Sequence, residues 1–434
     1  MRSAPLLLVL LLLSFPLWGR ETGVTVSFDD LVREPDRYVG RRVMVTTPLV
    51  INGVYYDSLI LSDQRLYVPE EHAIGLSEGD SAEYWRLVAL NRTRRLCLQT
   101  NHKPYKVYTG SIVRNLTAMV TRPGVLVTGK APRFDANRPD DCLPRMQNAN
   151  LVICSSNVQN LFADLGGYAG AKTEKQLDLQ VEKIAKGLLY TRADLFALCE
   201  VEEGNKTPAL LVERMNAKTR AGRYSWVESR TTDGDTIGVC YVYRTDRLLP
   251  YGETGYGYPE ESVYGERFKI KGFEHRATGE RFVVSLNHLR SKRGPAQRAD
   301  SLRMLNMHVV DSLLQLAPAL YRDSDILILG DFNCYTLERP IRHLIRQGYA
   351  DQVMRYDSTG YSYVYRSEAG FLDRVFASPS MADKIIGVKA LHLNADCFYS
   401  LGYRSRYAKR DRYRFSDHDP VLIYLRLSRS AAAR

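Results

Sequence analysis

Polar side chains stand directly after apolar, strand-like segments in the second half of the chain. In residues 326–335, ILILGDFNCY, four branched apolar residues and Gly330 precede Asp331 and Asn333, and the glycine leaves room for close approach to the backbone. Other apolar segments end in a similar way. The whole set is Asn157, Glu200, His288, Asp331, Asn333, Asp373, Asp417 and His418. Because strand ends meet at one edge of a layered α/β domain, we expect these side chains to share one site.

This set offers carboxylate, amide and imidazole groups and no thiol. Oxygen ligands suit Mg²⁺, with Mn²⁺ and Ca²⁺ as alternatives, and Mg²⁺ is commonly held by one or two carboxylates while a substrate phosphate completes its shell. Hydrolysis of a phosphodiester needs a positioned water, a base and relief of charge on the phosphoryl oxygens. The residue types therefore indicate metal-assisted phosphodiester hydrolysis. A single Asp or Asn after a strand is more often a turn residue, so the hypothesis depends on the whole set.

Charged neighbours of these residues have structural interpretations. We expect Glu202 and Glu203 to be solvated. Asp419 competes with the acid at position 417 for a role in the site. An ion pair with Arg374 is the structural alternative for Asp373. Histidines outside the motifs, His392 among them, are expected to be structural.

Strands alternate with helices from residue 151 onward. The segment NLVICSSNVQNLF begins as a buried strand, and helical spacing of leucine and valine predicts a long amphipathic helix from about Ala296 to Leu316. The strands have nearly continuous apolar runs, which is typical of strands covered on both faces. Residues 151–427 are therefore predicted to form a layered α/β domain, followed by a tail at 428–434.

The front of the chain has a different pattern. Residues 24–135 contain short alternating apolar segments broken by Gly, Asn and Asp, which predicts a small mostly-β domain, with a more helical stretch from Ser81 to Arg95. Residues 136–150 are rich in Pro, Asp and Asn and are predicted to be a linker.

Residues 1–19 combine an early Arg with an apolar stretch that is short for a membrane span, which is typical of a secretory signal peptide, with an uncleaved anchor as the alternative. We therefore expect a secreted or periplasmic protein with no membrane anchor after cleavage. Export permits disulfides, but seven cysteines are few and odd in number for this length, so a disulfide scaffold is not expected. Cys154, Cys199 and Cys240 lie in apolar runs and are expected to be core residues.

The formal net charge is +11, and arginine and tyrosine are concentrated in GYRSRYAKRDRYRFSDHD, residues 402–419. Basic side chains would neutralise phosphates while tyrosines pack on sugars or bases, so a polyanion such as DNA or RNA is the expected partner; a solvated basic loop is the alternative. No stable protein partner is evident. The residues expected to contact nucleic acid are Arg290, Lys292, Arg404, Arg406, Arg412 and Arg414.

Five segments, NVQNLF, CEVEE, NHLRSK, GDFN and SDHDPV, with LDRVFAS as a weaker sixth, resemble in this order the motifs of the endonuclease/exonuclease/phosphatase superfamily. The resemblance covers residues 151–426. It implies that family's two-sheet β-sandwich flanked by helices, a four-layer α/β/β/α architecture. It also implies that Glu200 is the principal Mg²⁺ ligand, with Asn157 and Asp417 near the metal or its waters.

The same resemblance implies the catalytic roles. Asp331 would orient or deprotonate the attacking water, and Asn333 would steady the phosphate. His418, held by Asp373, would stabilise the transition state, and His288 would protonate the leaving oxygen.

The motif NHLRSK and the segments DLVREPDRYVGRRVMVTTPLVINGVYY, RLYVPEEH, LNRTRRLCL and GVLVTGKAPRF resemble bacterial extracellular nucleases, which carry an OB-like domain before the nuclease domain. An OB-like module often binds single-stranded nucleic acid through aromatic and basic side chains, and the alternative is that it merely packs against the catalytic domain. The side chains available here are Tyr55, Tyr56, Tyr67, Arg41, Arg42, Arg92, Arg94 and Arg95. Several disulfides and acidic calcium sites of those relatives have no clear counterpart in this chain.

The function predicted from the sequence is a secreted, Mg²⁺-dependent nuclease that hydrolyses DNA or RNA by direct water attack. Two alternatives stay open. One is a sphingomyelinase-like or small-molecule phosphodiesterase or phosphatase, for which residues 251–268, YGETGYGYPEESVYGERF, are the candidate membrane-docking loop. The other is a non-catalytic secreted protein that binds nucleic acid.

Overall fold

The computed structural model describes residues 23–69, 81–135, 141–167, 169–219, 223–230, 236–258 and 267–428. The predicted signal peptide, residues 136–140 of the predicted linker and residues 429–434 of the predicted tail lie outside these ranges. Within them, no helix combines the length and the apolar character that crossing a membrane requires.

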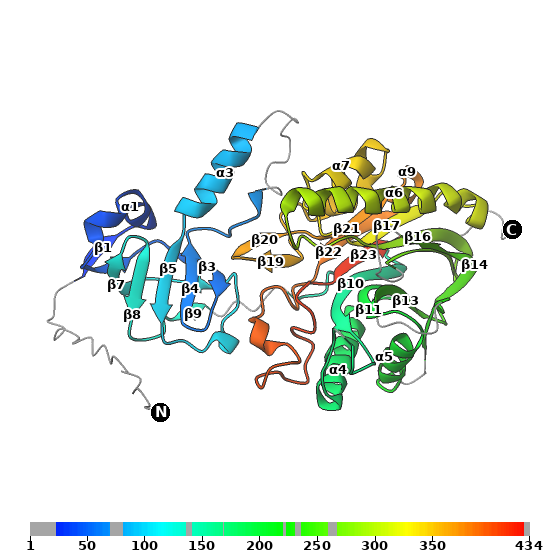
Figure 1. The fold of residues 1–434 in the computed structure, drawn as a ribbon, viewed down its shortest axis with the longest axis horizontal. Helices are drawn as coiled ribbons and strands as arrows, with labels where there is room; N and C mark the ends of the chain where they lie inside the picture. Colours follow the sequence, from blue (N-terminus) through cyan, green and yellow to red (C-terminus); the bar gives the residue numbers. More distant parts are fainter. Residues whose placement is uncertain are drawn as a thin grey trace, which may run out of the picture.

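Two six-stranded sheets form the centre of the larger, C-terminal part of the molecule (Figure 1). The first has the order β12 (Tyr224–Trp226), β13 (Ile237–Arg244), β11 (Leu195–Glu202), β10 (Leu151–Leu161), β23 (Val421–Leu425) and β22 (Ile385–Ala390). The second has the order β14 (Leu248–Gly257), β15 (Phe268–His275), β16 (Glu280–His288), β17 (Ile326–Asp331), β21 (Asp373–Ala377) and β18 (Ala350–Asp351). In each sheet the one parallel pair, β10 with β11 and β16 with β17, is connected through a helix.

Helices cover the outer faces of both sheets. They are α4 (Glu174–Thr191), α5 (Lys206–Asn216), α6 (Ala296–Tyr321) and α7 (Arg339–Arg346). The short helices α8 (Gln352–Tyr356) and α9 (Pro379–Ala382) instead contribute Val353 and Met381 to the core between the sheets. Ile153 and Phe282, one from each sheet, belong to the apolar core between the sheets. Ile184 of α4 packs on the far side of the first sheet, and Met307 of α6 packs on the far side of the second. The predicted four-layer α/β/β/α sandwich is therefore confirmed.

The long helix continues beyond its predicted end. It was expected to stop near Leu316, but α6 extends to Tyr321 and contains Pro318 near its end. Arg322 then ends the helix in a left-handed conformation with φ 51°. Apolar spacing alone did not show the last turn, because its buried Tyr321 donates hydrogen bonds to strand carbonyls instead of extending the aliphatic pattern.

The cysteines behave as expected. Cys154, Cys199 and Cys240 are buried in the core.

The described residues of the N-terminal part form a nine-stranded sheet with two helices and two 3₁₀ turns. Its elements are β1 (Val24–Val26), α1 (Phe28–Arg33), η1 (Pro35–Tyr38), β2 (Arg42–Val45), β3 (Leu49–Val54), β4 (Ser58–Ser62), α3 (Ser81–Thr93), β5 (Leu96–Thr100), η2 (Pro104–Lys106), β6 (Ile112–Val113), β7 (Leu116–Arg122), β8 (Val125–Thr128) and β9 (Phe134–Asp135). The strand-rich N-terminal domain and its helix near residues 81–95 are as predicted.

The N-terminal sheet must curl into a barrel. Six of its strands run in the order β2-β7-β8-β5-β4-β3, and laid flat they would separate β2 from β3 by about 24 Å. Only residues 46–48 connect these two strands, and so short a segment spans at most roughly 14 Å. The ends of the run are therefore close together. With β2 and β3 counted as one bent strand and β5 parallel to β8, this is the Greek-key order of an OB-like barrel.

The barrel contacts the sandwich through backbone as well as side chains. A small hairpin of the C-terminal part, β19 (Tyr363–Tyr365) and β20 (Glu368–Gly370), lies between them (Figure 1). Val68 N donates to Ala369 O at 2.9 Å, and Ala369 N donates to Leu66 O at 2.9 Å. Backbone hydrogen bonds fix both the distance and the register of the two segments, so the barrel has a defined position on the sandwich. We call this contact between residues 66–68 and the β19–β20 hairpin, with the side chains around it, the joint.

The tyrosines assigned to nucleic-acid contact partly serve this joint. The Tyr67 hydroxyl donates to Thr359 O at 3.0 Å, and the Tyr56 hydroxyl shares a 2.7 Å hydrogen bond with Ser400. These contacts favour the packing alternative for those two side chains.

Gly187 of α4 faces the ring of Phe415. Phe415 lies four residues before Asp419 in the sequence. A Cβ at position 187 would lie 2.3 Å from Cε1 of the Phe415 ring. Alanine in place of glycine normally stabilises a helix interior by about 0.5–1 kcal/mol. Here we expect the opposite sign, since forcing the buried ring aside costs about 1–3 kcal/mol. Gly187→Ala should lower the midpoint of thermal unfolding, whereas Gly129→Ala, where no atom lies within 4 Å of the new Cβ, should leave it almost unchanged. An equal or higher midpoint for Gly187→Ala would contradict the close packing of α4 against Phe415.

Candidate active site

Five of the predicted site residues lie at or near the ends of strands on one rim of the sandwich. Asn157 and Glu200 come from neighbouring strands of the first sheet, β10 and β11. His288 is the last residue of β16, Asp331 the last of β17 and Asp373 the first of β21. In the second sheet, His288 is paired in register with Asp331, and Asp331 with Asp373. Strand register alone therefore places these three side by side.

The two strands of the first sheet are irregular where they carry site residues. The pairing of β10 with β11 shifts between Asn157 and Leu161, and the pairing of β11 with β13 shifts at Glu200. Glu200 has φ 62°, and Gln159 and Asn160 have φ 55° and 52°. A bulge of this kind turns a side chain away from the regular alternation of a strand. The Glu200 carboxylate is thereby aimed at the rim, where its Oε2 accepts a hydrogen bond from Asn160 N at 2.9 Å.

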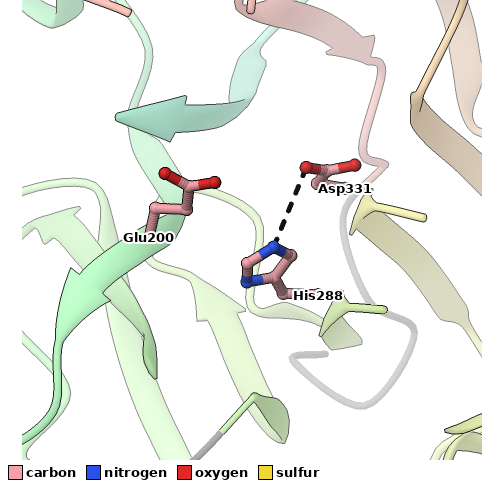
Figure 2. A group of neighbouring side chains, drawn as sticks. All are labelled: Glu200, His288 and Asp331. Atoms are coloured by element: carbon pink, nitrogen blue, oxygen red, sulfur yellow. Dashed lines mark ion pairs between the residues drawn. The ribbon is translucent and has the colours of Figure 1, made fainter. Parts of the chain in front are cut away.

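Three side chains from three strands converge on one another (Figure 2). Glu200, His288 and Asp331 each offer one ligand atom, and these atoms lie within 4.8 Å of one another. Nε2 of His288 is 3.9 Å from Oδ2 of Asp331. Asp331, Asp373 and His418 form a second group that meets the same criterion. Asp331 belongs to both groups and is therefore the centre of the site.

Asp331 is held by two amide groups. Its Oδ2 accepts from Nδ2 of Asn157 at 3.1 Å, and its Oδ1 accepts from the backbone N of Asn333 at 2.9 Å. Burial raises the pKa of Asp331 to about 7, and the charge of Asp373 adds to this while His418 opposes it. The carboxyl group is fixed in place and can exchange a proton near neutral pH.

His418 is oriented by Asp373. Nδ1 of His418 is 2.8 Å from Oδ2 of Asp373, and its Nε2 is directed to Asp331 at 3.9 Å. Burial alone would lower the pKa of His418, but the charges of Asp373 and Asp331 outweigh burial and hold the pKa well above its usual range. His418 is therefore a fixed cation at neutral pH. Arg374, the alternative partner of Asp373, instead donates to Thr336 at 2.9 Å.

His288 has the opposite character. Burial, with the charges of Arg267 and His418, holds its pKa well below the usual range. Its Nδ1 is buried and has no hydrogen-bond partner within the part of the chain that the structure describes. The two histidines of the site therefore differ in charge, one neutral and one cationic, because only His418 has a carboxylate at hydrogen-bond distance.

The remaining predicted site residues are less central. Asp417 belongs to neither of the groups above among the described residues, although its charge, after burial, raises the pKa of Glu200. Nδ2 of Asn333 donates to Leu289 O at 3.2 Å, and Asn333 has φ 50°.

Glu202 was expected to be solvated, and this is wrong: it is buried, and its Oε2 accepts from Ala163 N at 2.8 Å.

Most of the basic residues expected to contact nucleic acid have partners in the protein. Lys292 forms an ion pair with Glu338, and Arg412 pairs with Asp141 at 2.8 Å. Arg414 donates to a backbone carbonyl, and Arg290 is tied through its backbone N. Arg404 donates to Gly170 O and Arg406 contacts Tyr407, and both of these arginines are exposed. Arg404 and Arg406 are thus the members of this set best placed to meet an anion.

Two features of the site were not predicted. The ring of Tyr363 lies 4.6 Å from the ring of His418, and the alternating tyrosines of YSYVY were a signal that one face of a strand carries them. Asp419, considered only as a competitor of Asp417, is fully buried and binds Nδ1 of His392 at 2.8 Å. No local pattern marks that pair, because 27 residues separate its members.

Fold and site together define an α/β/β/α sandwich with an acidic, histidine-containing rim. A model of the endonuclease/exonuclease/phosphatase family matches residues 154–418, more than half of the chain. The chain belongs to this family, whose members are metal-dependent hydrolases of phosphoester bonds.

Solved structures resemble the chain over the same part. An endonuclease/exonuclease/phosphatase family protein from Bacteroides thetaiotaomicron is 18% identical, with 63% of this chain and 97% of that chain covered and a TM-score of 0.46. A mannosyl-6-phosphatase from the same species is 17% identical, with 64% and 99% covered and a TM-score of 0.45. A 3'-5' exonuclease from Neisseria meningitidis is 16% identical, with 64% and 100% covered and a TM-score of 0.41. None of the curated proteins compared with the chain matches it.

The donor set fits a hard divalent cation. Glu200 and Asp331 supply carboxylate oxygens and His288 an imidazole nitrogen within one small space, and no thiol takes part. Oxygen-rich sets of this kind favour Mg²⁺, Mn²⁺ or Ca²⁺ over softer ions. Neither carboxylate forms an ion pair with an arginine or lysine among the residues that the structure describes, so a cation would relieve their mutual repulsion.

Strands β16 and β17 approach each other closely at Gly330, just before Asp331, and this approach leaves no room for a side chain. Gly330 has φ 128°, and a Cβ there would lie 2.0 Å from Asn287 O of the paired strand. Gly330→Ala should therefore force β16 and β17 apart, lower the free energy of unfolding by about 2–4 kcal/mol and disturb Asp331. Chemical denaturation measures the change. Gly294→Ala is the matched control, because Gly294 has φ 93° but no atom within 4 Å of the new Cβ. If both variants lost the same stability, backbone strain rather than strand contact would be the cause.

Proposed function

We propose that the protein is a nuclease that hydrolyses phosphodiester bonds of DNA or RNA by metal-assisted attack of water. One observation carries the proposal: the Nε2 atoms of His288 and His418 each lie 3.9 Å from Oδ2 of Asp331, and a carboxylate oxygen of Glu200 belongs to the same group as His288 and Asp331. This arrangement offers a base, an anion-stabilising cation and metal ligands around one point.

Glu200 would hold the metal ion, with Asn157 and Asp417 near it or its waters. When bound, Mg²⁺ would supply charge that polarises the phosphate and lowers the pKa of a water. The chain positions these groups in advance, since Asn157 is buried and fixed by Gln159 N at 2.9 Å.

Asp331 acts on the attacking water. Its carboxyl group is held by Asn157 and Asn333, and its pKa near 7 lets it accept a proton at neutral pH. Asn333 lies two residues further along and steadies the phosphate.

The two histidines act on the charge that develops during hydrolysis. His418 is cationic and held through Nδ1 by Asp373, so its Nε2–H is free to bind a phosphoryl oxygen and stabilise the transition state. His288 is neutral, so it donates a hydrogen bond to the leaving oxygen, and the proton that this oxygen takes up comes from solvent. The reaction needs no covalent intermediate, because water attacks directly.

Nucleic acid is the proposed substrate because the chain carries a net charge of +11 and exposes Arg404 and Arg406 in the basic segment that leads to His418. We also propose export, from the composition of residues 1–19. The lipid alternative has less support. Residues 251–257 of its candidate docking loop lie in strand β14, where Tyr251 packs against Tyr321. Residues 259–266 lie outside the described ranges.

Removal of the cationic imidazole tests the proposed reaction. We expect His418→Ala to lower the rate of plasmid DNA cleavage in Mg²⁺ by on the order of 10²–10⁴-fold, because the transition state loses its main cation from the protein. Gel electrophoresis of plasmid, with and without a chelator, measures cleavage. His308→Ala, at an exposed histidine of α6, is the matched control.

Parallel reactions with single-stranded DNA, RNA and sphingomyelin identify the substrate class. Hydrolysis of sphingomyelin alone would contradict the nuclease proposal, as would full plasmid cleavage by His418→Ala.

Metal binding is tested without turnover. Glu200→Gln keeps the shape of the side chain and removes its charge. We expect its affinity for Mn²⁺ to fall by at least about tenfold, because mutation of a group that only hydrogen-bonds to a metal ligand already lowers metal affinity by about that factor. Electron paramagnetic resonance of free Mn²⁺ measures this. Glu213→Gln, at an exposed glutamate of α5, should bind as the wild type does. Equal affinity in Glu200→Gln would remove Glu200 from the metal site.

A further inference from the structure

Asp396 is a buried carboxylate that both parts of the molecule hold. Its Oδ1 accepts from Nη2 of Arg65 at 2.7 Å and from the Thr109 hydroxyl, both in the N-terminal barrel. Its Oδ2 accepts from the Tyr361 hydroxyl at 2.6 Å. The backbone takes part as well, since Thr109 N donates to Asp396 O at 3.1 Å. Asp396 is therefore a residue through which the barrel is hydrogen-bonded to the catalytic part.

A second set of contacts leads from Tyr361 toward the active site. The ring of Tyr361 stacks on that of His392, with centroids 4.2 Å apart and an interplanar angle of 19°. Nδ1 of His392 is 2.8 Å from Oδ2 of Asp419. His392, expected only to be structural, thus links the interface to the residue that follows the catalytic histidine in sequence.

The last contacts hold the chain at His418 and at Asp419. Oδ1 of Asp419 accepts from the backbone N of Asn394 at 2.7 Å and of Ala395 at 3.0 Å. Nδ2 of Asn394 donates to His418 O at 2.6 Å. The segment that carries Asp396 and the segment that carries His418 are therefore bonded directly to each other.

Arg65 provides the positive charge on which this set depends. Burial alone would raise the pKa of Asp396, but the charge of Arg65 and then that of His392 outweigh burial and lower it. Nη2 of Arg65 donates to Asp396 and to Thr109, and its Cζ lies 4.6 Å from the centroid of the Tyr361 ring, so the guanidinium is directed at this set of residues. Removing one partner of a buried ion pair leaves the other charge uncompensated. Without Arg65, Asp396 would have to take up a proton or move.

We propose that Arg65 of the N-terminal barrel is a positioning residue for His418, acting through Asp396, Tyr361, His392 and Asp419. The kinetic test of this inference rests on the proposed function, whereas the hydrogen-exchange test does not need activity. This role of Arg65 makes the barrel a part of the catalytic apparatus rather than a separately acting module.

Kinetics of the full chain test the proposal. A small displacement of a catalytic group can cost on the order of 10²-fold in rate, so Arg65→Ala should lower kcat by roughly tenfold to hundredfold with little change in KM. Arg65→Lys, which keeps the charge but not the forked geometry, should recover part of the loss. The matched control is Arg95→Ala, which removes the other arginine–carboxylate pair across the joint, with Glu368, but touches none of the residues between Asp396 and His418.

Hydrogen exchange of the metal-free full chain provides a readout that needs no activity. In Arg65→Ala, the amides of Asn394, Ala395 and Asp419 should exchange at least about tenfold faster, while those of β10 and β16 stay protected. Arg95→Ala should leave the first group unchanged. If Arg65→Ala fails to fold, Asp396→Asn, which keeps the shape of the side chain, tests the same link.

The outcomes separate the two proposals. Wild-type protein without phosphodiesterase activity would refute the proposed function and leave the exchange experiment to decide the role of Arg65. Active wild type with equal losses of kcat in Arg65→Ala and Arg95→Ala would show general weakening of the joint and overturn the positioning role. Unchanged exchange at positions 394, 395 and 419 would overturn it as well.

Discussion

The rim of the sandwich confines negative charges where water has little access, and this constraint shapes the rest of the site. Asp331 and Asp373 are almost completely buried, and Glu200 is close to the first of them. Burial and mutual repulsion both oppose ionisation of such groups. One protonated imidazole, His418, and several amide donors stabilise these acids. Within the described ranges, no arginine or lysine forms an ion pair with them. The deficit of positive charge that remains is what a divalent cation and a substrate would meet.

Several backbone positions at the same rim are in the left-handed region. Positive φ values occur at Gln159, Asn160, Glu200, Gly330 and Asn333, each within a few residues of a group that takes part in the site. Regular strands would direct alternate side chains into the two apolar cores and leave few free to converge. The bulges in β10 and β11 break that alternation only at their ends. The rest of each strand stays regular and buried, so the fold can hold conformations that would be unstable alone.

The sequence was informative about whatever follows from local pattern. Apolar runs and helical spacing predicted the layered sandwich, and the end of each run predicted the rim positions of Asp331, His288 and Glu200. What it could not show were contacts between segments distant in sequence. The pKa of Asp331 depends on burial and on the charges of His418 and Asp373, and Glu202 is held by the backbone of a loop 39 residues away. Composition also overstated the free charge of the basic segment, because Asp141 and Asp178 neutralise Arg412 and Arg410 at positions that no motif connects.

The segment between β22 and β23 explains why the barrel and the helices must take part in the site. Residues 391–420 contain one 3₁₀ turn, η3 (Tyr399–Leu401), and all of them are described. So long an irregular segment has many backbone groups that need partners, and it is uncommon in a compact domain unless something fixes it. Lys183 of α4 is buried and donates to the carbonyls of Lys409 and Tyr413, at 3.1 and 2.5 Å. The barrel holds the other end at Asp396. His418 is therefore positioned by two supports from outside its own sheet, which is how a loop residue attains the rigidity that catalysis demands.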